Sequence, residues 1–192
     1  MNGIVKKWAL ALLGNYSIYF VYRREGGAES ASATAPNASF DFRRIEEGSA
    51  RVSADPLVQA QIQYFGPGAH AFACLNGSRI VGLCFYWAGD RYRQRNFWPL
   101  ADDEAKLVQI MTLPDMRGRG IAGSLIEWSS QAMIDGGFRR LYARIWHSNN
   151  HSWRAFARAR WKRIALVIEI NPLRRSRPFR VSLGRKPLGR WN

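Results

Sequence analysis

The stretch that most constrains this chain is residues 107–123, with the sequence LVQIMTLPDMRGRGIAG. An apolar strand at 107–113 runs through the turn Pro114-Asp115-Met116 into a helix that we expect from about residue 118 to residue 134. A glycine-rich turn between a buried strand and a helix leaves backbone N–H groups open, and the helix dipole favours an anion there. The alternative is a plain tight connection between a strand and a helix.

The side chains of this turn favour a diphosphate ligand. Gly118 and Gly120 let the main chain approach a ligand closely, and Arg117 and Arg119 add positive charge. We therefore predict that the turn holds a pyrophosphate group.

The order of the surrounding elements predicts a mixed α/β fold. Two apolar runs flank Asn76-Gly77-Ser78, which is a strong hairpin signal and indicates antiparallel strands. We expect further strands at 40–45, 141–146, 163–170 and 179–183, helices at 54–65 and 149–160, and a loop at 91–103. Antiparallel strands followed by alternating strands and helices predict a mixed sheet covered by helices.

Composition suits one main domain with an N-terminal extension. The chain has 192 residues, 47% of them hydrophobic, which is enough to bury one core. Residues 25–39 are small and polar, so we interpret them as a linker or loop. They separate an extension at 1–24, with a helix and an aromatic strand, from the main domain at 40–192.

The extension is too polar to be a membrane span. Its apolar run Trp8–Leu13 is far shorter than the roughly 20 apolar residues that a span needs, and Gly14, Asn15 and Ser17 interrupt the next residues. The charges at Arg23, Arg24 and Glu25 also argue against a cleaved signal peptide, so we expect residues 1–24 to be retained.

The net charge of +15, with a pI near 10.8, favours anionic partners without choosing among them. Residues 171–192 contain seven basic residues and no acidic one, which a solvated basic tail also explains. Cys74 and Cys84 form no metal-ligand pattern and indicate reduced thiols. We predict no metal and a cytoplasmic location, with the inner face of a membrane as a further option.

Two motifs together resemble the GCN5-related N-acetyltransferase (GNAT) family. Residues 117–122, read as Arg-x-x-Gly-x-Ala after Leu-Pro-Asp-Met, are similar to its pyrophosphate motif. Asn149 and Ser152 are similar to its Asn-x-x-Ser helix, although Arg160-Trp161 stands where Gly-Phe is usual. The resemblance spans about residues 40–170.

The resemblance implies a mostly antiparallel sheet with helices on both faces and a splayed strand pair that holds acyl-CoA. It implies acetyl-CoA, or another acyl-CoA, as co-substrate and an N-acyltransferase reaction on a primary amine by direct attack. Main-chain N–H groups near Met111 and Thr112 would bind the acyl carbonyl. The implied cofactor-binding residues are Met111, Thr112, Arg117, Gly118, Arg119, Gly120, Ile121, Ala122, Asn149, Ser152 and Phe156.

The acid and base are less well defined. Phe156 stands where many members carry a tyrosine that protonates the departing thiolate, so Ser152 or water must serve. The base candidates are Glu104, His147 and a water relay. Basic and aromatic residues at 91–98 and 146–161 favour a flat or anionic small-molecule acceptor such as an aminosugar.

Two other functions remain open from the sequence. RAFARARWKR at 154–163 has the charge of a nucleic-acid-binding segment, although we do not expect a nucleic acid partner. Residues 8–22 could lie in a membrane interface between basic pairs, with or without catalysis. The sequence leaves the oligomeric state undefined, and a homo-oligomer is compatible with it.

Overall fold

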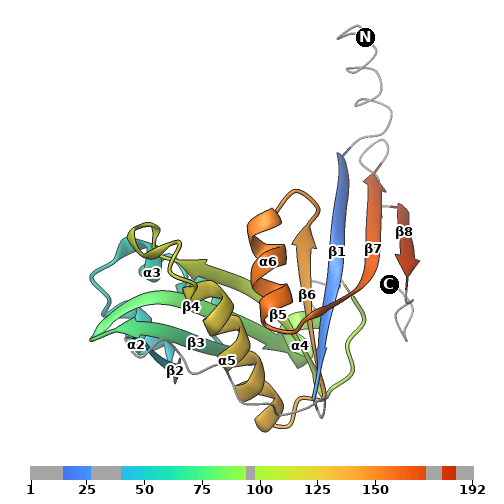
Figure 1. Cartoon of the computed structure of the whole chain (residues 1–192). Coiled ribbons are helices and arrows are strands. Elements are labelled where there is room, and N and C mark those ends of the chain that lie inside the picture. The colour runs from blue at the N-terminus through green and yellow to red at the C-terminus, as the bar shows by residue number, and fades with distance from the viewer. Residues whose placement is uncertain (1–14, 27–39, 94–97, 172–178, 185–192) are drawn as a thin grey trace, which may run out of the picture.

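The computed structural model describes residues 15–26, 40–93, 98–171 and 179–184. They form an eight-stranded sheet in the order β2-β3-β4-β5-β6-β1-β7-β8 (Figure 1). All neighbours pair antiparallel except β5 and β6, which are parallel. The strands are β1 (Asn15–Glu25), β2 (Asp41–Ile45), β3 (Ala69–Asn76), β4 (Arg79–Ala88), β5 (Glu104–Thr112), β6 (Arg140–Trp146), β7 (Lys162–Asn171) and β8 (Phe179–Gly184). This sheet confirms the expected mixed, mostly antiparallel fold.

Helices lie on both faces of the sheet. The long helix α5 and the shorter α6 lie side by side over one face, and α4 lies behind the other (Figure 1). The helical elements are α2 (Glu47–Arg51), α3 (Pro56–Gln59), η1 (Ile62–Tyr64), α4 (Gly89–Arg93), η2 (Pro114–Met116), α5 (Ile121–Asp135) and α6 (Asn150–Arg158). None of the described helices is both long and apolar enough to cross a membrane.

Two apolar clusters hold these layers together. The larger one contains Leu125 and Ile126 of α5, Phe156 of α6, and the β3–β4 hairpin that the sequence predicts. The smaller one joins Tyr19 of β1 to aromatic residues of β4, α4 and β6. Both cysteines lie in the larger cluster, and burial raises the pKa of each thiol to about 12.

The N-terminal strand corrects the expected domain boundary. β1 lies between β6 and β7, with Tyr19 opposite both Trp146 and Val167. Tyr19 and Val21 are fully buried. Because β1 pairs along both of its edges, residues 15–24 belong to the sheet and are not an extension outside the domain. The expected helix before residue 15, and residues 27–39 of the expected linker, lie outside the described residues.

Two local expectations also differ from the structure. The helix expected at 54–65 is broken into α3 and η1, although Asp55 caps α3 as expected by accepting a hydrogen bond from Leu57 N–H at 2.9 Å. The side-chain amide of Gln61 donates to the Leu57 carbonyl at 3.1 Å, at the junction of the two pieces. The loop expected at 91–103 begins with the last turn of α4.

The end of α6 explains the departure from the usual Gly-Phe. Arg160 adopts φ of 60°, a left-handed conformation that glycine adopts without strain. Trp161 N–H then donates to the Phe156 carbonyl at 3.0 Å, and its indole N–H donates to Ser130 Oγ at 3.1 Å. Arg160 therefore preserves the helix end that a glycine would form, at a conformational cost.

We expect Arg160→Gly to raise the free energy of unfolding by about 1 kcal/mol, because glycine removes the strain of a left-handed side-chain-bearing residue. It also removes a positive charge near Arg24, whose pKa is lowered by burial and by that charge. Urea denaturation measures the change, with Arg158→Gly, inside α6, as the control that should lower stability. A lower stability for Arg160→Gly would contradict this account.

Candidate functional site

The central feature of the site is a splay between β5 and β6. The two strands pair from Glu104–Arg140 to Leu107–Ala143, and no pair follows in the described strands, although both continue. Just beyond Leu107, Val108 is an extra residue in the pairing with β4, because Gln109 lies opposite Phe85 and Leu107 opposite Tyr86. Such a bulge increases the local twist, which turns β5 away from β6.

The register decides which peptide groups face the splay. Leu113 N–H donates to the Val81 carbonyl of β4 at 2.9 Å. Peptide groups alternate along an antiparallel pair, so Met111 N–H also points to β4, whereas Ile110 and Thr112 N–H point to the splayed edge. Of the two expected amide donors, only Thr112 directs its N–H to the splayed edge, and the other N–H that points there is that of Ile110 rather than Met111. The Thr112 hydroxyl is buried and has no hydrogen-bond partner among the described residues.

The glycine turn lies directly after this strand. Gly118 and Gly120 have φ of 78° and 79°, and a Cβ at either position would meet no heavy atom within 4 Å. Ser124 N–H donates to the Gly120 carbonyl, which is the first bond of α5. The N–H groups of residues 121–123 therefore have no acceptor within the helix, as at any helix N-terminus. With Ile121 and Ala122 at the helix start, the turn offers open amides and open space, as the pyrophosphate prediction requires.

The charges around the turn are predominantly positive. Arg117 Nε donates to the Thr112 carbonyl at 3.4 Å, so its guanidinium lies at the junction of strand and turn, and Arg119 is exposed. The only acidic residue of the preceding turn, Asp115, is 2.6 Å from Arg79, which lowers the pKa of its carboxyl group. Asp115 is therefore ionised, but the charge of Arg79 balances it.

The opposite lip carries the second motif. β6 ends at Trp146, three residues beyond Ala143 of the last strand pair, and His147 follows it. Asn149 follows and caps α6, its Oδ1 accepting a hydrogen bond from Ser152 N–H at 3.1 Å. Asn149 and Ser152 thus lie at the start of α6, on the β6 side of the splay. The roles of these side chains remain predictions.

Phe156 lies one turn further along α6 and is part of the core. It is 3% exposed, and its ring centroid is 5.9 Å from that of Tyr22 and 5.1 Å from that of Trp161. This packing leaves almost none of its surface for a ligand, so the structure does not support Phe156 as a cofactor contact.

Glu104 is wrongly placed for the base. It starts β5 at the paired end, eight residues and therefore about 26 Å from Thr112. Glu104 is 4% exposed, and its carboxylate accepts hydrogen bonds from Arg140 at 2.8 Å and Tyr142 at 3.3 Å. Ala101 N–H donates to the other oxygen at 3.0 Å. Glu104 therefore anchors the closed end of the strand pair.

His147 is better placed. It follows β6 on the splayed lip and is exposed, and its Nδ1 lies 3.1 Å from the Ile18 carbonyl. A carbonyl only accepts, so Nδ1 must carry the proton of this hydrogen bond. In the neutral ring this leaves Nε2 with a free lone pair, which is what a general base needs.

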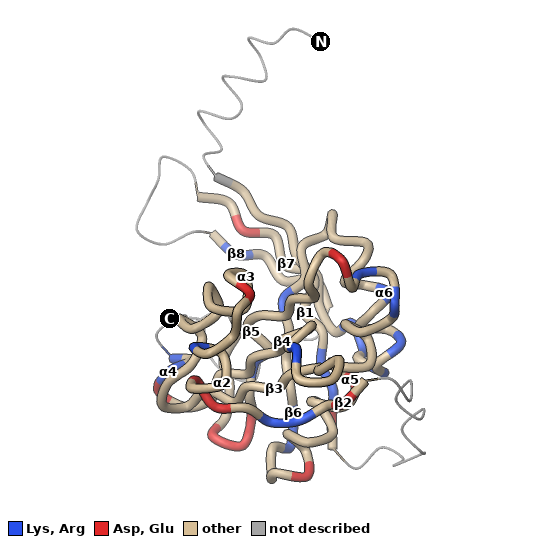
Figure 2. The backbone as a smooth tube through the Cα atoms, turned by 90° about the vertical axis from the view of Figure 1, so that its left-hand side faces the viewer, with Lys and Arg blue, Asp and Glu red and all other residues tan. Residues whose placement is uncertain are grey.

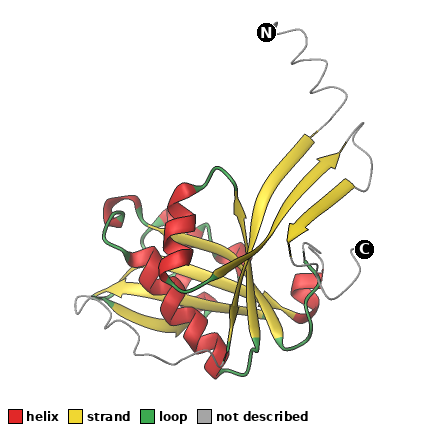
Figure 3. Ribbon diagram, turned by 45° about the vertical axis from the view of Figure 1, so that its right-hand side comes forward, coloured by secondary structure: helices red, strands yellow, loops and turns green. Residues whose placement is uncertain are grey.

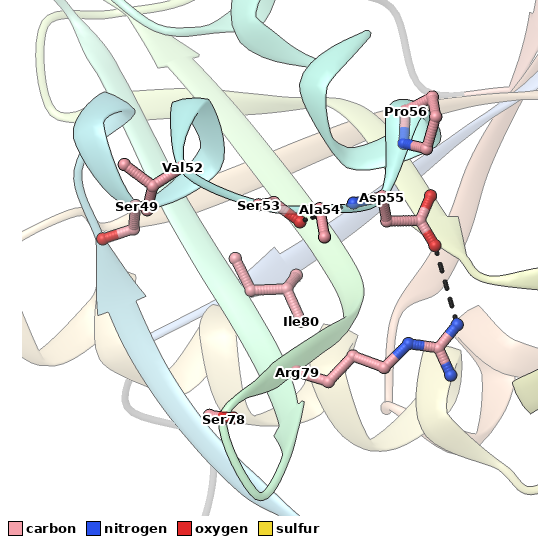
Figure 4. Close-up of a pocket in the computed structure, with 9 residues that line it drawn as sticks. All are labelled: Ser49, Val52, Ser53, Ala54, Asp55, Pro56, Ser78, Arg79 and Ile80. Carbon is pink, nitrogen blue, oxygen red and sulfur yellow. Dashed lines mark hydrogen bonds and ion pairs between the residues drawn. The ribbon is translucent and has the colours of Figure 1, made fainter.

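A cavity of about 500 Å³ lies apart from the splay, between the α2–α3 segment and the start of β4 (Figure 4). Arg79 on its wall is 3.6 Å from Asp55 and also holds Asp115. The lining includes neither the splayed edge of β5 nor the glycine turn. Among the described residues, no group of three or more His, Cys, Asp or Glu side chains is arranged to hold a metal ion.

A splayed strand pair next to a glycine turn at a helix N-terminus is the arrangement expected of coenzyme A-dependent acyltransferases. Known families agree: the acetyltransferase (GNAT) family matches residues 39–160, well over half of the chain. This chain belongs to the acetyltransferase (GNAT) family. The family uses acetyl-CoA as its co-substrate.

Solved structures share the fold at low sequence identity. A Drosophila protein has a TM-score of 0.57 and 16% identity, covering 90% of this chain and 57% of that chain. A putative GNAT acetyltransferase from Novosphingobium aromaticivorans has a TM-score of 0.57 and 14% identity, covering 82% and 64%. A GCN5-related N-acetyltransferase from Kribbella flavida has a TM-score of 0.55 and 14% identity, covering 90% and 59%. This chain spans about three fifths of the length of these structures, and no curated protein sequence matches it.

We expect Arg117→Gln to weaken coenzyme A binding by about tenfold or more, because it removes a charge-assisted contact to the diphosphate. Isothermal titration calorimetry with free coenzyme A measures the affinity. Arg43→Gln is the matched control, because Arg43 is exposed on the edge strand β2, with β3 and β4 between it and β5, and its loss changes the net charge equally. Equal affinities of the two variants would place the diphosphate elsewhere.

Proposed function

We propose that this chain transfers an acyl group, acetyl in the first instance, from coenzyme A to a primary amine. The observation that carries the proposal is the splayed edge of β5, where Ile110 and Thr112 direct peptide groups away from β4 and toward the opposite lip. A glycine turn with open amides lies at the end of the same strand. One segment thus offers donors for an acyl carbonyl and for a diphosphate.

The residues on the two lips would divide the binding work. Arg117 and the N–H groups at the start of α5 would hold the diphosphate, and the edge of β5 would hold the pantetheine by main-chain hydrogen bonds. On the other lip, the Asn149 oxygen already caps α6, so its side-chain NH₂ group is the part left for the ligand. Acetyl-CoA, when bound, supplies the acyl group as an activated thioester.

Direct attack by the amine needs no covalent enzyme intermediate. Thr112 N–H would stabilise the negative charge that develops on the acyl oxygen, which is worth roughly 3 kcal/mol for one such donor. Holding both reactants between the lips makes the attack effectively intramolecular. His147 Nε2, directly after β6 on the opposite lip, would take the proton from the amine directly or through water.

The acceptor we propose is a small molecule such as an aminosugar. Trp146 ends β6 on the lip and is 44% exposed, and the Arg144 guanidinium lies 5.0 Å from the centre of its ring. Exposed indole faces stack well on flat or ring-shaped groups, and the arginine favours an anionic substituent. This pair supports an acceptor that combines a ring with negative charge.

A thermal-shift titration tests the donor. Acetyl-CoA and free coenzyme A should raise the melting temperature in a concentration-dependent way, and longer acyl-CoA forms define the acyl length that the splay accepts. ADP is the matched ligand, because it has the diphosphate but not the pantetheine, and it should stabilise the protein less. An unchanged melting temperature with every form of coenzyme A would refute the proposal. Release of free thiol with a panel of amines then identifies the acceptor.

We expect His147→Gln to lower kcat for acyl transfer by about 10²-fold, because general-base catalysis contributes at least that much. The KM for acetyl-CoA should stay within about twofold, since His147 is assigned to proton transfer and not to cofactor binding. His151→Gln is the control: that residue is also an exposed histidine, in the first turn of α6. If both variants retain full kcat, water takes the proton without His147.

A further inference from the structure

An exposed apolar face lies outside the cleft, on strands β1, β7 and β8. In β8 the apolar residues Phe179, Val181 and Leu183 alternate with polar ones and are 58%, 52% and 56% exposed. Alternate residues of a strand share one face, and cross-strand partners share it too. The partners of these three on β7 are Ile170, Ile168 and Leu166, all partly exposed.

The same face continues onto β1. Tyr16, Ile18 and Phe20 lie opposite Ile170, Ile168 and Leu166, and Tyr16 is 58% exposed. The result is a patch of nine apolar side chains in three rows, named the β1–β7–β8 face. Among the described helices, α6 covers it at Phe20, because Trp153 packs on that ring at 5.2 Å. Figure 3 shows these strands projecting beyond the helices. Soluble domains rarely expose so continuous an apolar patch unless it binds something.

The described part of the chain around this face is mostly basic. Residues 140–171 and 179–184 contain eight lysines and arginines but only one acidic residue, Glu169. Glu169 lies on the opposite face of the sheet, where Tyr19, Ser17 and Arg180 donate hydrogen bonds to it. Beside the apolar face, Arg163 lies 4.7 Å from the centre of the Phe20 ring, and Arg154 and Arg158 of α6 are exposed. Figure 2 shows the basic segments along α6.

We propose that the β1–β7–β8 face docks on an anionic lipid bilayer. A bilayer surface presents acyl chains for the apolar rows and negative headgroups for the basic border, and binding strength follows both. A second copy of this chain would bring two basic borders together, which opposes association. A nucleic acid would satisfy the charges but not the apolar rows, because it is bound mainly through phosphates.

The sequence that enters the face has the same character. Lys6 and Lys7 precede the apolar run Trp8–Leu13, which Gly14 and Asn15 separate from Tyr16 in the sequence. The inference goes beyond acyl transfer and does not depend on it, because no residue of the face belongs to the proposed cofactor site.

Vesicle flotation tests the inference on the full chain. We expect retention on vesicles of phosphatidylcholine with phosphatidylglycerol, weaker retention on phosphatidylcholine alone, and a loss of anionic-vesicle binding as salt rises. Val181→Gln with Leu183→Gln should lower the vesicle partition coefficient at least about tenfold. Val52→Gln with Leu57→Gln should leave it unchanged, because these residues are 85% and 47% exposed but lie at the end of α2 and on α3.

The outcomes separate this inference from its rivals. Melting temperatures of both double variants equal to that of the unmodified protein would show that the fold is intact. An equal loss of vesicle binding in both variants would then overturn the assignment to this face. Failure of the unmodified protein to float with anionic vesicles would overturn the proposal. A dimer in light scattering that dissociates only in the Val181→Gln, Leu183→Gln variant would also overturn it. Binding of the unmodified protein to DNA that is lost in this variant would do the same.

Discussion

The hydrogen bonds that β5 and β6 do not form beyond Leu107 are the constraint on which the site depends. A buried strand edge normally pairs, because an unpaired peptide group away from water is costly. Here β4 holds one edge of β5 as far as Thr112, while the bulge at Val108 turns the other edge away from β6. The open edge is therefore rigid, and a ligand that pairs with it meets donors already in place, which is the condition for electrostatic stabilisation of a transition state.

The other lip needs support of its own, and β1 provides it. After Ala143, β6 has lost β5 as a neighbour but remains paired with β1 as far as Trp146. Phe20 of β1 packs on Trp153, and the Arg24 guanidinium donates to the Ala159 carbonyl at 3.0 Å and to Gln131 Oε1 at 3.1 Å. The N-terminal strand thus fixes β6 and both helices beside the cleft. Without it, the lip that carries Asn149 and Ser152 would have no neighbouring strand on either side.

Local sequence signals predicted the parts of the site that depend on local geometry. Gly118 and Gly120 adopt a positive φ that favours glycine, so a glycine at each position is a local signal of the turn. The strand, turn and helix were placed correctly from this local pattern. The direction of Met111 N–H depends on pairing with β4, so the sequence alone could not separate it from Thr112. The prediction of Glu104 as a base candidate was wrong because it also depended on strand pairing. An acidic residue at the start of a strand does not indicate which end of the strand pair is closed. The inclusion of β1 was missed because apolar residues on both faces do not identify their partners.

Ile18 connects the cleft with the apolar face. Its carbonyl lies 3.1 Å from both the backbone nitrogen and Nδ1 of His147, and its side chain lies in the middle row of the β1–β7–β8 face. The peptide that fixes the tautomer of His147 therefore belongs to the strand that we assign to the bilayer. Because β1 pairs with both β6 and β7, a contact that holds the projecting part of β1 also holds the splayed lip. Membrane docking and orientation of the base would then depend on the same strand.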